Sequence, residues 1–220
     1  MEKLAYTLSL PQSELYYLVA EKMSFKITVT LRAKRVERWI RAVKRDFLDA
    51  APIKCVGLDC EFTDPREGNQ RAAVLQLSVA YETLVFQICF ADKVPQLLKD
   101  FLADENIRFC GAAIHNDVKM LSTYGIVIPS AFNLQEILPN PTAKQLPSLY
   151  DLANYYIGTE LKQKKKRNKR DMNRQKTADE EAEDALIFGW GNVPLSYEQV
   201  QYAALDARLG FELGVCAFSV

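Results

Sequence analysis

The first regular pattern along the chain is an alternation of apolar and polar residues over 25–31 (FKITVTL), which predicts a β-strand. In the next segment, 32–48, apolar residues recur at the spacing of one helical face, and basic residues surround that face. The face holds Val36, Trp39, Ile40, Val43 and Phe47. We therefore expect a strand followed by an amphipathic helix at the start of the chain.

The following pattern is dominated by short β-rich runs. Residues 53–62 (IKCVGLDCEF) predict a strand, and Pro65 and Gly68 mark a loop over 63–71. Two further runs, 72–80 and 83–90, lie close together in sequence, which favours a pair of antiparallel strands. These runs predict a sheet with several strands adjacent in sequence.

Strands and helices alternate in the rest of the chain. A strand is expected over 107–114, and the helices are expected over 94–104, 116–125 (ending at a glycine C-cap), 146–158 and 196–217. The last of these begins with Ser196 and Gln199 at capping-box spacing. The order of elements predicts an α/β fold in which helices flank a mixed β-sheet.

Length and composition fit one domain over 1–220, with an N-terminal strand and helix in 1–50 and a core in 51–220. The chain has 28 basic and 28 acidic residues, so it shows no overall basic signature for nucleic acid. The N-terminus lacks a signal-peptide core, no apolar run reaches transmembrane length, and the five scattered cysteines are typical of reduced thiols. These features favour an intracellular protein without a membrane partner.

One segment, 162–184, departs from the globular pattern. Nine of the fifteen residues from Lys162 to Lys176 are basic, and DEEAED directly after them has five acids in six positions. We expect a mobile, charged loop or a solvated helix there. The basic run has three possible roles: a solvated loop, a contact with a phosphate backbone, or a nuclear localisation signal, which its segment KKKRNKR resembles. The location of the protein, nuclear or cytoplasmic, is therefore left open.

Two acids inside the apolar run GLDCEF are the first chemical signal. In a strand, residues i and i+2 point to the same face, so Asp59 and Glu61 should lie side by side. Two adjacent negative charges in an apolar setting are costly unless a positive group neutralises them. Hard divalent cations prefer oxygen ligands, and the single histidine, His115, excludes a multi-histidine site. The pair therefore predicts a metal site.

Three more residues could join this pair. Asp117 follows an expected strand at the start of a helix, where an aspartate alone usually caps the helix or interacts with its dipole. Tyr202 and Asp206 are four residues apart on the last helix, so they share one face of it. Asp206 is an acid among apolar residues, which indicates either a solvent-facing position or a site.

Taken in order, these motifs give the chain a family resemblance. Asp59-Cys60-Glu61, then Asp117, then Tyr202 to Asp206 resemble the DEDD 3′–5′ exonucleases with tyrosine, which have an RNase H-like fold. WGNVPLSYEQVQYAALDARLGF (190–211) resembles more closely the Werner-syndrome-type exonuclease domain, and the N-terminal strand and helix resemble those that precede this domain in its small plant members. The likeness covers roughly residues 50–217, and the His115-Asn116 pair before Asp117 departs from many relatives.

The resemblance implies a two-metal hydrolysis with Mg²⁺ or Mn²⁺. Asp59 would bridge both ions, Glu61 and Asp206 would hold the ion that binds the attacking water, and Asp117 would help to hold the other. Tyr202 would orient that water. Possible substrate contacts are Phe62, His115, Lys164, Lys165, Lys166 and Arg167. For Phe62 the alternative is core packing, and for His115 it is a partly buried position at a strand end.

The resemblance leaves three kinds of function to compare. The first is a 3′–5′ exonuclease on DNA or RNA, which acts alone or recruits a partner such as a helicase. The second is a catalytically weak nucleic-acid-binding or regulatory module on the same fold, against which the intact set of acids argues. The third is an endonuclease or transposase of RNase H-like fold, which the tyrosine on the last helix disfavours. The oligomeric state stays open.

Overall fold

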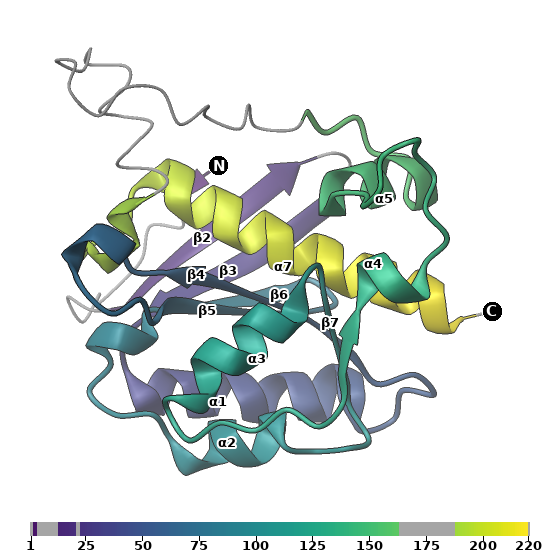
Figure 1. Cartoon of the computed structure of the whole chain (residues 1–220). Helices are drawn as coiled ribbons and strands as arrows, with labels where there is room; N and C mark the ends of the chain where they lie inside the picture. Colours follow the sequence, from purple (N-terminus) through teal and green to yellow (C-terminus); the bar gives the residue numbers. More distant parts are fainter. Residues whose placement is uncertain (1, 4–12, 21–22, 163–187, 220) are drawn as a thin grey trace, which may run out of the picture.

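A mixed eight-stranded β-sheet forms the centre of the molecule (Figure 1). The computed structural model describes residues 2–3, 13–20, 23–162 and 188–219. The strands, in their order across the sheet, are β1 (Glu2–Lys3), β2 (Ser13–Ala20), β3 (Met23–Thr30), β6 (Glu82–Phe86), β5 (Ala72–Val79), β4 (Cys55–Phe62), β7 (Arg108–Gly111) and β8 (Ala131–Asn133). The pairs β3–β6, β4–β7 and β7–β8 are parallel, and the other neighbours are antiparallel.

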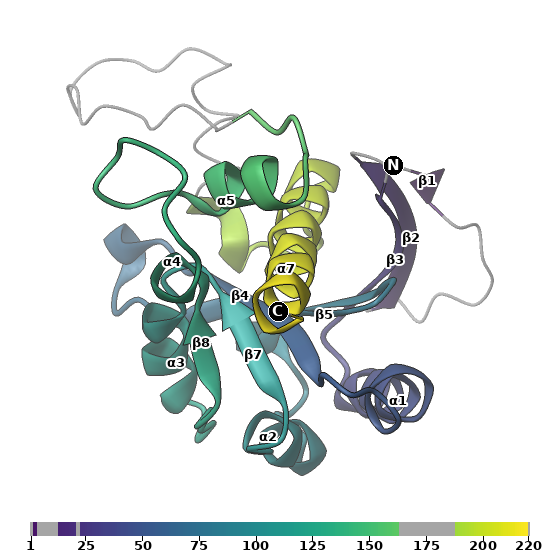
Figure 2. The same cartoon turned by 90° about the vertical axis from the view of Figure 1, so that its right-hand side faces the viewer.

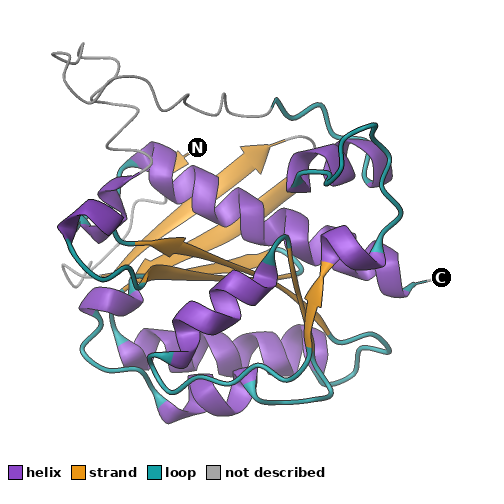
Figure 3. Cartoon of the chain, in the orientation of Figure 1, coloured by secondary structure: helices purple, strands orange, loops and turns teal. Residues whose placement is uncertain are grey.

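Helices cover both faces of this sheet, as the end-on view in Figure 2 shows. One face carries α1 (Ala33–Val43), α2 (Gln96–Leu102) and α3 (Ile114–Ser122), while the other carries α5 (Leu149–Tyr156) and α7 (Tyr197–Phe218). Figure 3 distinguishes helices, strands and loops by colour. The shorter helical pieces are a π-helix at Lys44–Leu48, 3₁₀ turns at Pro65–Glu67, Ile88–Phe90 and Gly189–Gly191, and α4 (Leu134–Ile137). A mixed sheet flanked by helices, as the sequence predicts, is confirmed.

The central strand β5 shows how the layers are held together. All of its side chains are buried, because helices cover both of its faces. Leu75 and Leu77 belong to the core shared with α1, α2 and α3, whereas Val74 packs with residues of α7. Burying a side chain of this size contributes about 1.5–3 kcal/mol relative to leaving it exposed. The strand is therefore a fixed base for its neighbour β4, which carries Asp59 and Glu61.

Helix α7 lies unusually close to β4. A Cβ atom built on Gly57 would come within 1.9 Å of the Ala207 carbonyl oxygen, and one built on Gly214 within 2.4 Å of the Cys55 Sγ atom. At Gly57 only glycine lets the helix backbone approach the strand backbone so closely, and at Gly214 glycine leaves room for the Cys55 side chain. The consequence is that a side chain on α7 reaches the acids on β4.

Some strand predictions are wrong in extent. β1, β2 and β8 are missing from the sequence prediction, and β2 is hard to detect because Tyr17 and Val19 are exposed apolar residues that blur its alternation. The strand expected over 83–90 ends at Phe86, because the chain enters a 3₁₀ turn at Ile88–Phe90. Between them, the Gln87 side chain donates to the Asn192 carbonyl.

The strand expected over 107–114 also ends early, at Gly111. Ala113 adopts a left-handed conformation (φ +54°), and its N–H donates to the Asn133 side chain. This turn starts α3 at Ile114, two residues earlier than the expected helix start at residue 116.

Helix boundaries differ in two further places. The helix expected over 32–48 becomes a π-helix from Lys44, so Leu48 is buried and Phe47 is only half-buried. The helix expected to end at a Gly125 cap ends at Ser122, although Gly125 does have a positive φ of +67°. α4 was not predicted, whereas α7 and its capping box of Ser196 and Gln199 are confirmed.

Three other expectations can be compared with the described residues. All five cysteines are free, and Cys55, Cys60 and Cys110 are buried. No helix in the described parts of the chain has the length and hydrophobicity needed to cross a membrane. The basic run and the acidic block, including Lys164, Lys165, Lys166 and Arg167, lie outside the described residues.

Candidate active site

The site is built from β4 and α7, two elements far apart in the sequence. Asp59 and Glu61 project from the same face of β4, toward α7, while Cys60 between them is buried in the core on the opposite face. This is the arrangement that the i, i+2 spacing predicts. A bulge follows at Glu61 and Phe62, where the register with β5 shifts.

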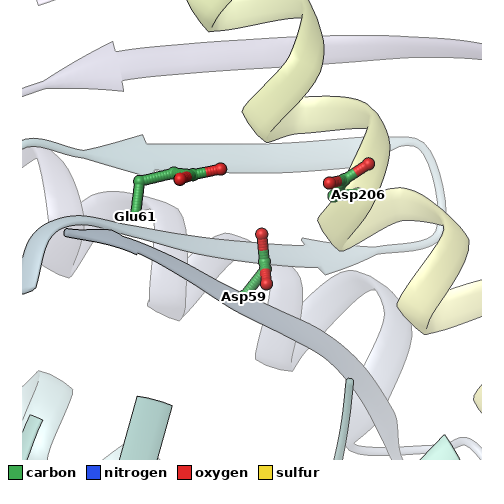
Figure 4. A group of neighbouring side chains, drawn as sticks. All are labelled: Asp59, Glu61 and Asp206. Carbon is green, nitrogen blue, oxygen red and sulfur yellow. The ribbon is translucent and has the colours of Figure 1, made fainter. Parts of the chain in front are cut away.

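Asp206 approaches this pair from the middle of α7. Each of Asp59, Glu61 and Asp206 offers a carboxylate oxygen, and the three oxygens lie within 4.8 Å of one another. Figure 4 shows the three carboxylates converging on the space between strand and helix. Asp59 and Glu61 are half-buried, and Asp206 is only 8% exposed. The sequence predicted this meeting of acids, and the structure brings these three together.

The cluster is electrostatically unfavourable by itself. Burial raises the pKa of Asp59 well above its ordinary value, and the charges of Asp117, Asp206 and Glu61 raise it further. A hydrogen bond from the backbone N–H of Cys60 opposes this rise, but it is the smaller effect. A cation among the oxygens would remove the repulsion, and a set of carboxylates with no nitrogen or sulfur ligand suits a hard divalent ion. The residues therefore fit such an ion.

Asp117 lies beside the cluster without joining the group of three. It is in the first turn of α3 and only 4% exposed, and burial raises its pKa to about 8. Its charge is the largest electrostatic influence on the pKa of Asp59 and also raises the pKa of the Cys60 thiol. Asp117 is thus near Asp59, but the close group has three carboxylates where the sequence suggested a cage of four.

Two tyrosines, not one, approach the acids. Burial raises the pKa of Tyr202 well above its ordinary value, and Asp206, Glu61 and Asp59 add to this effect. Burial raises the pKa of Tyr150 on α5 in the same way, and the charges of Asp206, Asp59 and Glu61 add to this effect. Sequence reasoning found Tyr202 from its spacing to Asp206 but missed Tyr150. No local pattern could have found Tyr150, because its contact depends on how α5 packs against α7.

The other expected substrate contacts have different positions. Phe62 packs against the core cluster on the α1, α2 and α3 side of the sheet, although it is not fully buried. His115 is not the partly buried strand-end residue considered above: its side chain is 66% exposed in the first turn of α3, with Nε2 3.5 Å from a Glu136 carboxylate oxygen. It is exposed because the left-handed turn at Ala113 starts the helix before it.

Comparison with known proteins identifies the family. The family model described as 3′–5′ exonuclease matches residues 31–214. The chain belongs to this 3′–5′ exonuclease family. The matched region contains all five of the residues singled out above: Asp59, Glu61, Asp117, Tyr202 and Asp206.

Individual relatives of this exonuclease-family chain are distant. "Exonuclease 3′-5′ domain-containing protein 2" of Drosophila melanogaster is 32% identical over 86 residues, which is 38% of this chain and 15% of that protein. The catalytic core of RRP6 from Trypanosoma brucei matches with a TM-score of 0.63 at 15% identity, covering 91% of this chain and 48% of that one. Escherichia coli RNase D, described as an exoribonuclease, gives 0.61 at 17% identity, covering 90% and 46%.

These structural likenesses show a shared fold. The chain spans about half the length of the RRP6 and RNase D structures and a smaller share of the Drosophila relative. The fold agrees with the RNase H-like exonuclease fold that the sequence motifs implied. The closer likeness to the Werner-syndrome-type domain and the tyrosine subclass stay predictions.

Proposed function

We propose that this protein is a metal-dependent 3′–5′ exonuclease that removes nucleotides from the 3′ end of a nucleic acid. The observation that carries the proposal is the group of three carboxylates, Asp59, Glu61 and Asp206, within 4.8 Å of one another between β4 and α7. Repulsion among these carboxylates destabilises the folded protein unless a cation is bound. Membership of the 3′–5′ exonuclease family supports a role in metal-dependent catalysis for them.

The four acids would have different roles in phosphodiester hydrolysis. Two divalent ions, Mg²⁺ or Mn²⁺, would supply an activated water and stabilise the charge that develops on the leaving oxygen. Asp59, Glu61 and Asp206 would hold these ions, and buried Asp117 would add negative charge beside Asp59. Because these acids come from β4, α3 and α7, the packing of the helices on the sheet fixes their positions relative to one another.

Tyr202 would orient the attacking water by a hydrogen bond. Its raised pKa means that the phenol keeps its proton at neutral pH, so it is unsuited to act as a base. It lies one helical turn before Asp206 on the same face of α7, so it approaches the acids from the same helix. This assignment corresponds to the tyrosine subclass that the sequence resembles.

The alternative is a protein of this family that binds nucleic acid or regulates another protein without cutting. It is less well supported, because all four acids and Tyr202 are present, and a close group of carboxylates is costly in a folded protein unless a cation neutralises it. A recruitment partner such as a helicase, and a nuclear location directed by KKKRNKR, are further proposals that rest on the sequence alone.

The test is degradation of matched 5′-labelled substrates by the purified protein with Mg²⁺ or Mn²⁺. Single-stranded DNA, duplex DNA with a recessed 3′ end, and RNA should be compared, since one protein of similar fold is described as an exoribonuclease. A ladder that shortens stepwise from the 3′ end is expected on at least one of them. The Asp59→Asn variant is the matched inactive control.

Two results would contradict the proposal. A 3′-blocked substrate that is cut internally would indicate an endonuclease. Absence of cleavage on all three substrates with either metal, while the protein still binds them, would favour the regulatory alternative.

A further inference from the structure

Gln76 is a fully buried side chain in the middle of the sheet, next to the acid cluster. It lies on β5, directly opposite Asp59 of β4 in the antiparallel register. Directly opposite residues share one face of the sheet, and their Cβ atoms are about 4.5–5.5 Å apart. This face is the one that α7 covers, because Val74, two residues earlier on β5, packs with residues of α7, whereas Leu75 and Leu77 pack on the other side.

The Gln76 amide has no hydrogen-bond partner among the residues that the structure describes. Both Nε2 and Oε1 are covered by protein, and neither forms a hydrogen bond. Much of the surroundings is apolar, because Val85, opposite Gln76 on β6, belongs to one apolar cluster with Ala203 and Ala204 of α7. The large majority of buried polar side-chain atoms in proteins are hydrogen-bonded, because an unpaired one destabilises the fold. A glutamine at this position therefore requires an explanation other than packing.

Asp59 is the group best placed to become the partner of this amide. Ser78 and Thr83, the next polar pair on the same face of β5 and β6, are hydrogen-bonded to each other at 2.9 Å. Asp59 is half-buried, lies directly opposite Gln76 and belongs to the close group of carboxylates. A carboxylate has two oxygens, so one can accept from the amide N–H while the other faces a metal ion.

We infer that Gln76 is a positioning residue of this site: when Asp59 binds a divalent metal ion, the amide N–H of Gln76 donates to its carboxylate and fixes the orientation of that carboxylate. The inference rests on the proposed function, which makes Asp59 a metal ligand. The buried amide gains its partner together with the ion, so this bond contributes to metal affinity. Groups that hydrogen-bond to a metal ligand typically change metal affinity or activity by roughly 10–100-fold when they are removed.

The test combines two measurements on Gln76→Met, because methionine has a similar length and no amide. The first is Mn²⁺ binding by isothermal titration calorimetry without substrate, and we expect binding about 10-fold weaker than in the wild type. The second is the melting temperature in EDTA, which should be at least as high as that of the wild type, since an apolar side chain replaces a buried amide without a partner. A purely structural glutamine gives the opposite pattern, a lower melting temperature and an unchanged Mn²⁺ affinity.

Gln87→Met is the matched control. Gln87 is also buried, with 3% of its surface exposed, but its amide donates to the Asn192 carbonyl at 2.9 Å. Removal of this bond should lower the melting temperature and leave the Mn²⁺ affinity unchanged. Gln76→Leu is a second variant at the inferred position, with a shorter apolar side chain, and should weaken Mn²⁺ binding by a similar factor.

The outcomes distinguish this inference from the proposed function. Equal Mn²⁺ affinity of Gln76→Met and wild type overturns the inference, as does a wild type that does not bind Mn²⁺ at all. A lower melting temperature of both Gln76 variants in EDTA, or failure of both to fold, also overturns it, because the amide then stabilises the protein without an ion. If Mn²⁺ binding is weakened as expected but the wild type degrades no nucleic acid, the inference holds and the exonuclease proposal fails.

Discussion

At the scale of single residues, Asp59 opposes folding as long as no metal is bound. Its pKa in the folded protein is raised by burial and by Asp117, Asp206 and Glu61. The folded state therefore holds this proton more tightly than the unfolded chain, whose carboxyl has a pKa of about 3.9. The Asp59 carboxyl therefore lowers the stability of the folded protein by an amount that increases as the pH rises above about 4.

We therefore predict that Asp59→Asn raises the melting temperature in EDTA at neutral pH while it abolishes cleavage. Asparagine keeps the shape of the side chain and removes the charge. Adding Mn²⁺ should stabilise the wild type, because a ligand that binds only the folded state raises stability, and should stabilise the variant much less. Differential scanning calorimetry with and without Mn²⁺ measures both effects.

The control for this prediction is Asp100→Asn, an exposed acid on α2, on the face of the sheet opposite α7. Its melting temperature should stay within the error of the wild type in both buffers. A lower melting temperature for Asp59→Asn in EDTA would show that the aspartate contributes net stabilisation and that the repulsion is outweighed.

At this scale the sequence predicted part of the site. The meeting of Asp59 and Glu61 follows from strand periodicity, and Tyr202 and Asp206 share a face because of helical periodicity. The position of Asp117 outside the close group could not be derived, because it depends on the left-handed turn at Ala113. Tyr150 could not be found at all, because only tertiary packing brings it to Asp206.

At the scale of elements, the close contact of α7 and β4 is what unites the site. A Cβ atom at Gly57 would lie 1.9 Å from the Ala207 carbonyl oxygen and 2.4 Å from the Phe211 backbone nitrogen. Both are backbone atoms of α7, so the helix would have to move as a whole. Because Asp206 is on the same helix, such a movement would also separate it from Asp59.

We predict that Gly57→Ala lowers the free energy of unfolding by about 3 kcal/mol, the upper end of overpacking effects, and reduces cleavage strongly. Urea unfolding followed by circular dichroism gives the first quantity, and the cleavage assay gives the second. Gly191→Ala is the matched control, because no atom lies within 4 Å of a Cβ built there. A Gly57→Ala variant as stable as the wild type would mean that α7 is not confined by β4.

The capping box of α5 offers a pH-dependent prediction. Burial by itself would raise the pKa of Asp151, but hydrogen bonds from Lys144 and Ser148 outweigh it and lower the pKa to about 2. A carboxyl whose pKa is lowered on folding stabilises the protein above its unfolded pKa of about 3.9, and this contribution is lost as the pH falls toward 2.

We expect Asp151→Asn to lower the melting temperature at pH 7 by about 2–4 °C, for a cap worth about 1 kcal/mol. The difference from the wild type should shrink as the pH is lowered from 4 to 2, since the wild type then loses the same charge. Thermal melts across this pH range measure it. A difference that is independent of pH would mean that the carboxylate charge has no part in the cap.

The elements themselves show where sequence patterns are sufficient. β4, β5 and α7 were predicted because their periodicity is strong and their ends have clear signals, such as the capping box of Ser196 and Gln199. β2 has apolar residues on both faces, and β8 and α4 are too short to show a period. The π-helix after α1 was not foreseen, because a single extra residue in a turn leaves no pattern in the sequence.

At the scale of the whole molecule, charge is distributed unevenly although the net charge is zero. The close acid group lies between the sheet and α7, while α1, with its basic residues, lies on the other face. A nucleic acid that approaches the acids would therefore need cations from elsewhere in the chain. The Lys162–Lys176 run, with nine basic residues, is the strongest candidate in the sequence.

Salt dependence tests whether this run contacts the substrate. Binding that neutralises phosphates weakens with salt, with a slope of about 0.7 per contacted phosphate for a single strand. We expect the slope to fall by ~2–3 units when four residues are changed to serine. These are Lys164, Lys165, Lys166 and Arg167. The effect should appear in Kd or KM and not in the chemical step, because the reacting groups are the acids.

The measurement is equilibrium binding of a labelled single strand to Asp59→Asn protein, from low to moderate salt, so that the substrate is not consumed. A control variant loses the same amount of positive charge from exposed positions on and just after α1. It carries serine at Lys34, Arg38, Arg41 and Arg45. If contact with the run provides the cations, only the first variant flattens the slope, because the control residues are on the far side of the sheet. Equal flattening in both variants would indicate a general effect of net charge, and unchanged slopes in both would show that the run does not touch the substrate.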